Sequence, residues 1–350
     1  QSASAREGTA WDIDKTDVYV NYDENNIAHN GEPITVWGVQ QDFRFPLLYV
    51  AGRKVLKHET EMQERLHDDT RRELTRDVLQ AYYDLVCFNC MEKHYKVLDT
   101  LYTRYAGAAI RRREAGEANR LDVLMARSKR DEIAVLLKQV REDRNNARSR
   151  LMRLVQDDEE ITASMDSLPR LSHQNGNLTG NPLLAYQEVA VKKSRQQLRQ
   201  KRLNWLPDIS LGYFQGTNDY QNARTYKGFE VGFSFPLFFG SQTAGTRSQR
   251  LSWEATQKEA EETERRLRGR LASLQAQMTK LEKALDVFES RGRDLSYEMI
   301  RTARRSYEEG EINMSEYVAA VEQARSTILD YLKNLKEYNR IVLDINYLIK

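Results

Sequence analysis

The chain has 350 residues, of which 30% are charged and 40% hydrophobic, and its formal net charge is only +2. Its mean hydropathy of -0.73 and the absence of an apolar run of about 18–20 residues exclude a helical membrane protein. The near-neutral balance argues against a nucleic-acid-binding protein, which usually carries a basic excess. The 9% of aromatic residues argue against a disordered chain.

The first regular segment is a predicted β-hairpin at 17–45, and no signal peptide is expected in the polar stretch that precedes it. We expect strands at Asp17–Tyr22 and Ile34–Phe45, joined by a long polar loop at Asp23–Glu32. Apolar residues such as Trp37 alternate with polar ones in the second strand, so one face of the hairpin should be apolar.

Two long helices are predicted next, at 51–115 and 118–156, because the chain lacks proline from 47 to 168. The first would be about 95 Å long. A turn at Gly116-Glu117 separates the two helices. The first helix has a narrow apolar seam with charged faces beside it, which is typical of coiled-coil packing. Residues of this seam include Leu74, Val78, Ala81, Leu85 and Phe88.

The second half of the chain repeats this order after a polar linker at 157–181. A helix at 182–203 leads into a second predicted hairpin at 209–239, which has a polar loop at Gly216–Lys227. Long helices are predicted at 245–309 and 313–349, with Gly310-Glu311 between them. The last strand alternates strictly, and its apolar side chains are Phe229, Val231, Phe233 and Phe235.

These parallels indicate an internal duplication, with two landmarks in the same order in each copy. The first pairs Phe43, Phe45, Pro46 and Leu47 with Phe233, Phe235, Pro236 and Leu237. The second pairs REAGEANRLDVLMA, 113–126, with YEEGEINMSEYVAA, 307–320. We therefore predict a first repeat at 1–156 and a second at 182–350. The helix at 182–203 has no counterpart before the first hairpin, so a leading helix is expected to be missing there.

A two-stranded hairpin with one apolar face is not stable alone, so the four strands should complete a sheet with other chains. A closed barrel could place that apolar face in a bilayer, with Glu230, Gly232 and Ser234 toward the lumen. A soluble, oligomeric coiled coil capped by a β-subdomain fits the same periodicity. The residues alone leave both interpretations open.

The sequence resembles the TolC family of outer-membrane efflux ducts over nearly its whole length. The similarity is carried by NWLPDISLGYF, GFEVGFSFPLFFGSQ and RRSYEEGEINMSEYVAAVEQA, at 204–214, 228–242 and 304–324. Segments 39–57 and 234–242 most resemble the Cus/Czc branch, which works with heavy-metal RND pumps. The resemblance implies an α+β fold and a homotrimer. Its 12-stranded β-barrel would lie in the outer membrane and continue into a periplasmic α-helical tunnel.

The resemblance also implies partners and sites at the two helix-hairpin tips. A periplasmic adaptor would dock at the tips, and the inner-membrane RND pump would supply the energy. The tip residues are Arg112, Arg113, Gly116, Glu117, Gly310 and Glu311. In the family, a tip acid is linked to a tyrosine three residues before the second glycine, and the link holds the entrance shut. Those positions are Asp122 and Tyr307, whereas the family's gate arginine is replaced by Ile312.

Position alone suggests a further role for two acids, because Asp122 and Glu316 each lie six residues past a tip glycine. About one and a half turns up the return helices, they would place six carboxylates around the mouth of a trimeric tunnel. Such rings favour cations. Both acids being ordinary solvated helix residues is the alternative interpretation.

Motifs of catalysis are missing: we find no phosphate-binding glycine loop, no GxSxG and no HExxH. An enzyme, a cofactor and a nucleic-acid partner are therefore not expected. Cys87 and Cys90 form a CxxC inside a helix, where small packing residues, a strained disulfide and weak metal contact are all conceivable. The expected function is a passive exit duct for heavy-metal cations, with organic compounds or a pore-free scaffold as alternatives.

Overall fold

The computed structural model describes residues 2–156, 161–236 and 239–349. Within these ranges, none of the helices combines the length and apolar character that a membrane span requires. The chain divides into two compact units, 1–69 with 182–265, and 70–181 with 266–350. Each unit contains parts of both sequence repeats, because two long helices, α2 (Pro46–Glu114) and α5 (Phe239–Val287), contribute to both.

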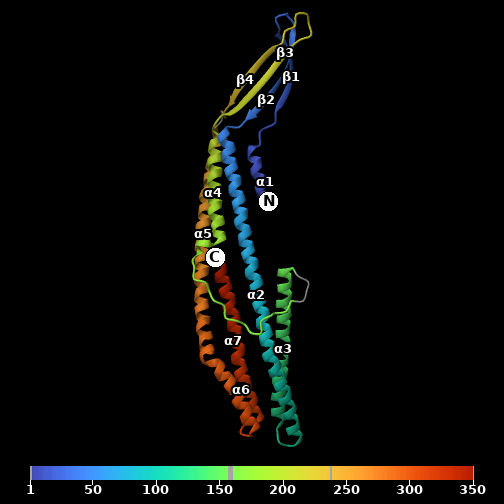
Figure 1. Cartoon of the computed structure of the whole chain (residues 1–350), viewed down its shortest axis with the longest axis vertical. Helices are drawn as coiled ribbons and strands as arrows, with labels where there is room; N and C mark the ends of the chain where they lie inside the picture. The colour runs from blue at the N-terminus through green and yellow to red at the C-terminus, as the bar shows by residue number, and fades with distance from the viewer. Residues whose placement is uncertain (1, 157–160, 237–238, 350) are drawn as a thin grey trace. The chain divides into compact units, whose positions relative to one another are not determined.

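The first unit is built on a four-stranded antiparallel sheet in the order β1-β2-β3-β4, visible in the upper part of Figure 1. The strands are β1 (Asp17–Ile27), β2 (Pro33–Phe43), β3 (Asp208–Thr217) and β4 (Tyr226–Ser234). β2 pairs directly with β3, so the two hairpins of the two repeats form one sheet. β1 and β4 are left as its edges.

The prediction of a long loop in the first hairpin is wrong, since β1 continues to Ile27. All of β1 is exposed, so an edge strand can accept the polar residues at 23–26 without burying them. The chain reverses within a few residues, where Gly31 has a φ of +81°. Glycine suits this turn because it adopts positive φ without a steric penalty.

The two faces of the sheet differ in composition. Cross-strand pairs such as Val231 with Leu211 and Val20 with Trp37 place large apolar side chains on one face. The opposite face is rich in glycine, and side chains from neighbouring strands lie flat over these positions. A Cβ on Gly38 would come within 2.5 Å of the Tyr19 ring. Aromatic side chains over glycines are a known means of holding a curved sheet.

A duplicated aromatic contact joins the segments that flank each hairpin of the sheet. Trp11, in the 3-10 helix η1 (Glu7–Trp11) that follows α1 (Ser2–Arg6), stacks on Tyr49 with centroids 5.8 Å apart. Trp205, just after α4 (Pro182–Leu203), stacks on Phe239 at 5.6 Å. In each repeat, the segment before the hairpin is thus held to the start of the helix after it.

Both long helices begin earlier than expected. α2 starts at Pro46 rather than at 51, because proline at the first helical position loses no hydrogen bond. α5 is described from Phe239 rather than from 245. The end of the predicted second hairpin at 237–238 and the start of the predicted linker at 157–160 lie outside the described residues.

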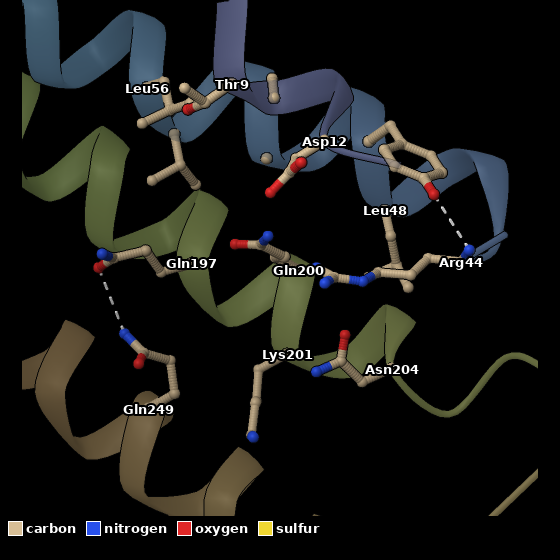
Figure 2. Close-up of a pocket in the computed structure, with 14 residues that line it drawn as sticks. Thr9, Asp12, Arg44, Leu48, Leu56, Gln197, Gln200, Lys201, Asn204 and Gln249 are labelled. Atoms are coloured by element: carbon tan, nitrogen blue, oxygen red, sulfur yellow. Dashed lines mark hydrogen bonds between the residues drawn. The ribbon is translucent and has the colours of Figure 1, made fainter. Parts of the chain in front are cut away.

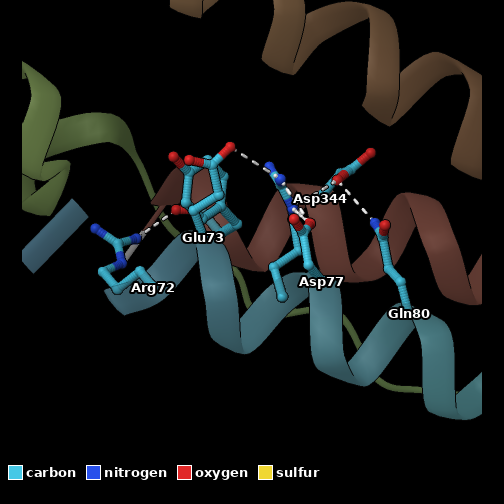
Figure 3. A network of polar contacts seen from close by, with 7 residues as sticks. Arg72, Glu73, Asp77, Gln80 and Asp344 are labelled. Carbon is cyan, nitrogen blue, oxygen red and sulfur yellow. Dashed lines mark hydrogen bonds and ion pairs between the residues drawn. The ribbon is translucent and has the colours of Figure 1, made fainter. Parts of the chain in front are cut away.

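The second unit packs α2, α3 (Arg120–Val155), α5 and α7 (Met314–Ile349) around one core. Its most deeply buried side chains are Leu85, Val86, Leu285, Leu335, Val342, Ile345 and Leu348. A polar network joins α2 to α7 (Figure 3), in which the Arg76 guanidinium lies 4.5 Å from the Tyr347 ring centroid. The same arginine pairs with Asp77 at 2.8 Å and approaches Asp344 at 3.8 Å.

The predicted continuous helix at 245–309 is interrupted. A π-helical turn, η3 (Phe288–Gly292), separates α5 from α6 (Arg293–Glu308). The Phe288 ring stacks on Tyr331 at 4.1 Å, and a Cβ on Gly292 would lie 2.9 Å from this ring. Arg170 of the linker pairs with Asp286 and Glu289 at 2.7 and 2.9 Å. Contacts made by the linker therefore stabilise the break.

The linker is held against α7 by asparagine side chains. Asn339, only 1% exposed, accepts a hydrogen bond from the Leu171 N–H at 3.0 Å and donates one to the Pro169 carbonyl at 2.8 Å. One heptad later, Asn346 accepts a hydrogen bond from the Gln174 N–H at 2.9 Å. These side chains satisfy backbone groups that neither a helix nor a sheet provides for.

Candidate functional site: the two helix-hairpin tips and the apolar sheet face

The two helix hairpins of the second unit end in the same backbone motif. Gly116 and Gly310 have φ of +81° and +77°. In the first tip, Gly116 N–H donates to the Arg113 carbonyl and Glu117 N–H to the Arg112 carbonyl, at 3.0 and 2.8 Å. Gly310 and Glu311 repeat both bonds onto Tyr307 and Ser306. This is the Schellman arrangement, in which glycine takes the left-handed position.

The return helices begin with a duplicated capping box. Asn119 accepts a hydrogen bond from the Asp122 N–H at 2.9 Å, and Asp122 accepts one from the Asn119 N–H at 3.2 Å. Asn313 and Glu316 make the same reciprocal pair, at 3.0 and 2.9 Å. Both acids therefore lie at the third residue of a return helix, nearer its start than the expected one and a half turns. Their carboxylates help to cap the amino end of the helix.

The predicted link between Asp122 and Tyr307 is not formed within the described chain. The Asp122 carboxylate is engaged by its own helix cap. The Tyr307 ring stacks on Tyr317 instead, with centroids 5.1 Å apart and an interplanar angle of 14°. Tyr307 is 40% exposed, so its ring edge remains accessible at the second tip.

The charged tip residues fold back on the preceding helix. Arg112 approaches Glu117 at 3.7 Å with both side chains more than half exposed. The Ser306 hydroxyl donates to Glu311 at 2.8 Å. Arg113 is exposed and forms no ion pair in the part of the chain that the structure describes. These contacts are of the weak, solvent-screened kind.

The sequence analysis missed an exposed apolar stripe at the first tip. Leu121, Leu124 and Met125 are 62, 52 and 56% exposed. They share a helix face because Leu124 and Met125 lie three and four residues after Leu121. At the second tip, Val318 occupies the position equivalent to Leu124 and is only 3% exposed. The spacing of apolar residues in the predicted helix at 118–156 is a signal for an apolar face. It does not show which of these side chains are buried within one chain.

The strand residues expected to face lipid are all exposed in the single chain. Phe229, Val231, Phe233 and Phe235 are 84, 61, 60 and 62% exposed, although Phe235 lies just after β4. The apolar face extends further than predicted, since Val18 and Val20 of β1 are 73 and 71% exposed. An exposed apolar surface of this kind marks contact with lipid or protein.

Cys87 and Cys90 lie in the core of the second unit as free thiols. Cys87 is fully buried, and its Sγ approaches the Leu332 carbonyl at 3.6 Å. Burial raises the pKa of Cys87 to about 12, so the thiol keeps its proton at neutral pH and is a poor metal ligand. The described residues contain no group of three His, Cys, Asp or Glu side chains that could hold a metal ion.

Changing the tip glycines should have the opposite effect from changing a glycine within a helix. Gly310→Ala forces alanine into a left-handed conformation, so we expect a loss of about 1–2 kcal/mol at the tip. Gly269→Ala, at an exposed and uncrowded position inside α5, should instead gain up to about 1 kcal/mol. Denaturant unfolding of the two variants measures both values. Equal signs would contradict the tip assignment.

A histidine of α2 that contacts α7, His94, should make the second unit sensitive to acid. Arg325 donates a hydrogen bond to Nδ1 of His94 at 2.9 Å. Burial and the charge of Arg325 lower the pKa of His94 to about 4. An unfolded histidine has a pKa of about 6.5, so the unfolded chain binds the extra proton first.

The stability contributed by this neutral histidine is present above pH about 6.5 and is lost as the pH falls toward about 4. We expect His94→Gln, which retains an acceptor, to lose less stability over this range than the wild type. Unfolding curves at several pH values test this, with the exposed His67→Gln as the matched control. Parallel pH profiles for wild type and His94→Gln would contradict the prediction.

Comparison with known proteins identifies the fold. The profile of the family described as outer membrane efflux protein matches residues 176–344. No curated protein sequence matches the chain. The outer-membrane channel OprN superposes with a TM-score of 0.80 at 15% identity, covering 99% of this chain and 84% of that one.

CmeC, an outer membrane channel of Campylobacter jejuni, gives a TM-score of 0.77 at 13% identity, with 99% of this chain and 80% of that one covered. CusC gives 0.77 at 15% identity, with 99% and 86% covered. The chain therefore has the fold of these outer-membrane channels, and its second half, residues 176–344, matches the outer membrane efflux protein family.

Proposed function

We propose that this protein is the outer-membrane exit duct of a tripartite, RND-type efflux system. It would be a passive channel rather than an enzyme. The observation that carries the proposal is the apolar face shared by all four strands, whose side chains on β1 and β4 are more than half exposed. In water this face would be costly, whereas lipid would cover it at no such cost.

The edges of the sheet support a closed assembly. β1 and β4 carry unpaired backbone groups along one side, and a sheet in lipid must satisfy all of them. A homotrimer that joins β4 of one chain to β1 of the next would close a 12-stranded barrel without edges. The glycine-rich face would then line the concave, aqueous interior, with the helices forming a periplasmic tunnel.

The tips would surround the periplasmic entrance of this tunnel and meet the adaptor. The exposed stripe of Leu121, Leu124 and Met125 suits a helical partner better than the charged residues Arg112 and Arg113, because its burial would release more water from apolar surface. Heavy-metal cations are the proposed cargo, on the resemblance of 39–57 and 234–242 to the Cus/Czc branch. Organic compounds are the other candidate cargo.

The function is tested by fractionation and conductance. The protein should be recovered with outer membranes and should form discrete channels in planar bilayers. Cells that lack it should become sensitive to metal salts, and complementation should restore tolerance. Recovery in the detergent-free soluble fraction would favour the pore-free scaffold. Restored tolerance to dyes or drugs but not to metals would refute the heavy-metal cargo and would still support an exit duct.

The acids at the entrance should influence ion selectivity. Glu316→Gln and Asp122→Asn remove charge but keep an oxygen that can accept the hydrogen bond from the Asn313 or Asn119 N–H, because an amide can replace a carboxylate in a capping box. If these carboxylates ring the mouth, the cation-to-anion permeability ratio should fall severalfold. Glu282→Gln, away from the tips, serves as the control. An unchanged ratio would mean that the acids only cap their helices.

Tyr307→Phe examines the entrance separately. The change keeps the stacking on Tyr317 and removes only the hydroxyl. If the trimer brings this hydroxyl to Asp122, the open probability should rise in Tyr307→Phe and in Asp122→Ala. The double variant should add little, because one interaction is removed twice. Wild-type open probability in both single variants would exclude the gate.

A further inference from the structure

A hollow of about 490 Å³ lies in the first unit where the sheet meets the helices. It is lined by η1, the start of α2, the end of α4 and α5. Arg44 follows β2 directly and Asn204 precedes β3, so the hollow is at the base of the sheet. Its volume is within the range of small-molecule sites.

The polar side chains of α4 form one stripe along this hollow. Gln197, Gln200, Lys201 and Asn204 follow the spacing of a single helix face. Figure 2 shows Arg44, Gln200 and Asn204 directed into the same space. Neither Gln200 nor Asn204 makes a side-chain hydrogen bond among the described residues, so their amides are available to a ligand.

Two cations, Arg44 and Lys201, line the hollow together with one acid, Asp12. Among the described residues Arg44 is paired with Asp14, at 3.4 Å, with both side chains about half exposed. Lys201 forms no ion pair in the described ranges and lies over Gly245, where a Cβ would come within 2.6 Å of its Cε. The first turn of α2, which also lines the hollow, contains no acid.

The remaining residues that line the hollow provide one acidic group and an apolar floor. Asp12 enters the hollow from the end of η1, opposite Gln200 (Figure 2). Leu48, Val55 and Leu56 also line the hollow and form its apolar floor. A ligand matching this arrangement has an anionic group, a nearby cation and an apolar stem.

We propose that this hollow binds the phosphoethanolamine headgroup of a phospholipid. The phosphate is placed at Arg44 and Lys201, the ammonium at Asp12, and the first methylene groups on the apolar floor. This inference rests on the proposed function, since the base of a membrane-embedded sheet is at the level of lipid headgroups. The lipid would then hold the segment before β1 against α2 and α4.

A simpler role for Lys201 is to complement the carboxyl end of α4. Arg202 occupies the same last turn and does not line the hollow. Arg202→Gln is therefore the matched control for Lys201→Gln, because a dipole effect or general surface charge would be lost equally in both.

The test titrates the full chain, purified in detergent, with dilauroyl phosphatidylethanolamine and counts bound lipid by native mass spectrometry. Loss of a charge-assisted contact should weaken binding about tenfold in Arg44→Gln and in Lys201→Gln, but not in Arg202→Gln. Asp12→Asn should weaken binding of phosphatidylethanolamine and leave phosphatidylglycerol unaffected. Gly52→Met, which fills the hollow without changing charge, should also reduce binding.

Wild-type affinity in the Arg44→Gln and Lys201→Gln variants, or an equal loss in Arg202→Gln, would overturn the proposal. Soluble O-phosphoethanolamine competing as well as the lipid would also overturn it, by making the site one for a free metabolite. Failure of the wild type to fractionate with outer membranes would instead overturn the proposed function. The two failures are therefore distinguishable.

Discussion

Val231→Arg is expected to destabilise the assembled sheet of the proposed duct by about 2–4 kcal/mol, the cost of a charged side chain on the lipid face of a membrane sheet near its midplane. Val231 lies near the middle of β4, is 61% exposed in the single chain, and pairs across the strands with Leu211 on the apolar face. An arginine there would have to reach an interface or leave the bilayer. Heat-modifiable migration and denaturant unfolding of the oligomer measure the loss.

Ser234→Arg is the control, three residues further along the same strand. Its side chain lies on the opposite face, directly across from Asp208, so a new arginine there gains an acidic neighbour instead of lipid. We expect a change within about 1 kcal/mol, as for exposed ion pairs. Equal effects in the two variants would mean that the faces are assigned incorrectly.

Asn339→Leu is expected to cost about 2–6 kcal/mol in the second unit, because it leaves two backbone groups without their hydrogen-bond partner at about 1–3 kcal/mol each. The Leu171 N–H and the Pro169 carbonyl both bond to the Asn339 amide, which is 1% exposed. Leucine has the same number and branching of side-chain heavy atoms and leaves no cavity, so the loss would report mainly the hydrogen bonds. Denaturant unfolding gives the value.

Asn346→Leu serves as the comparison, since Asn346 makes the same kind of bonds to Gln174 and Ser172 one heptad later. These bonds are more exposed, so water can replace them, and we expect a loss of about 1 kcal/mol or less. A similar loss at both positions would mean that burial of the linker does not decide its stability.

The sequence by itself determined the local features whose causes lie within a few residues. The glycines at 116 and 310 indicated both helix reversals, because a left-handed turn favours that residue type. Strict alternation in β4 indicated its apolar face, since a strand has a period of two. The duplication followed from comparing the chain with itself.

Only the tertiary structure decided features that depend on contacts distant in sequence. β2 pairs with β3, although 165 residues separate Phe43 at the end of β2 from Asp208 at the start of β3. The sequence of either hairpin does not indicate this pairing. The π-turn at Phe288–Gly292 depends on Tyr331 and on Arg170 of the linker. Asp122 and Glu316 could be assigned to helix caps only once the first residue of each return helix was known. The stacking of Tyr307 on Tyr317 likewise depends on how the two helices of the second tip pack.

The physical reason is the range of the forces involved. Turn geometry and periodicity are local, so they are written in short stretches of sequence. Burial, stacking and the pairing of Asn339 with the linker backbone depend on which segments meet. An exposed Leu124 and a buried Val318 at equivalent positions of two similar repeats show that the same local pattern can have different surroundings, which only the folded chain determines.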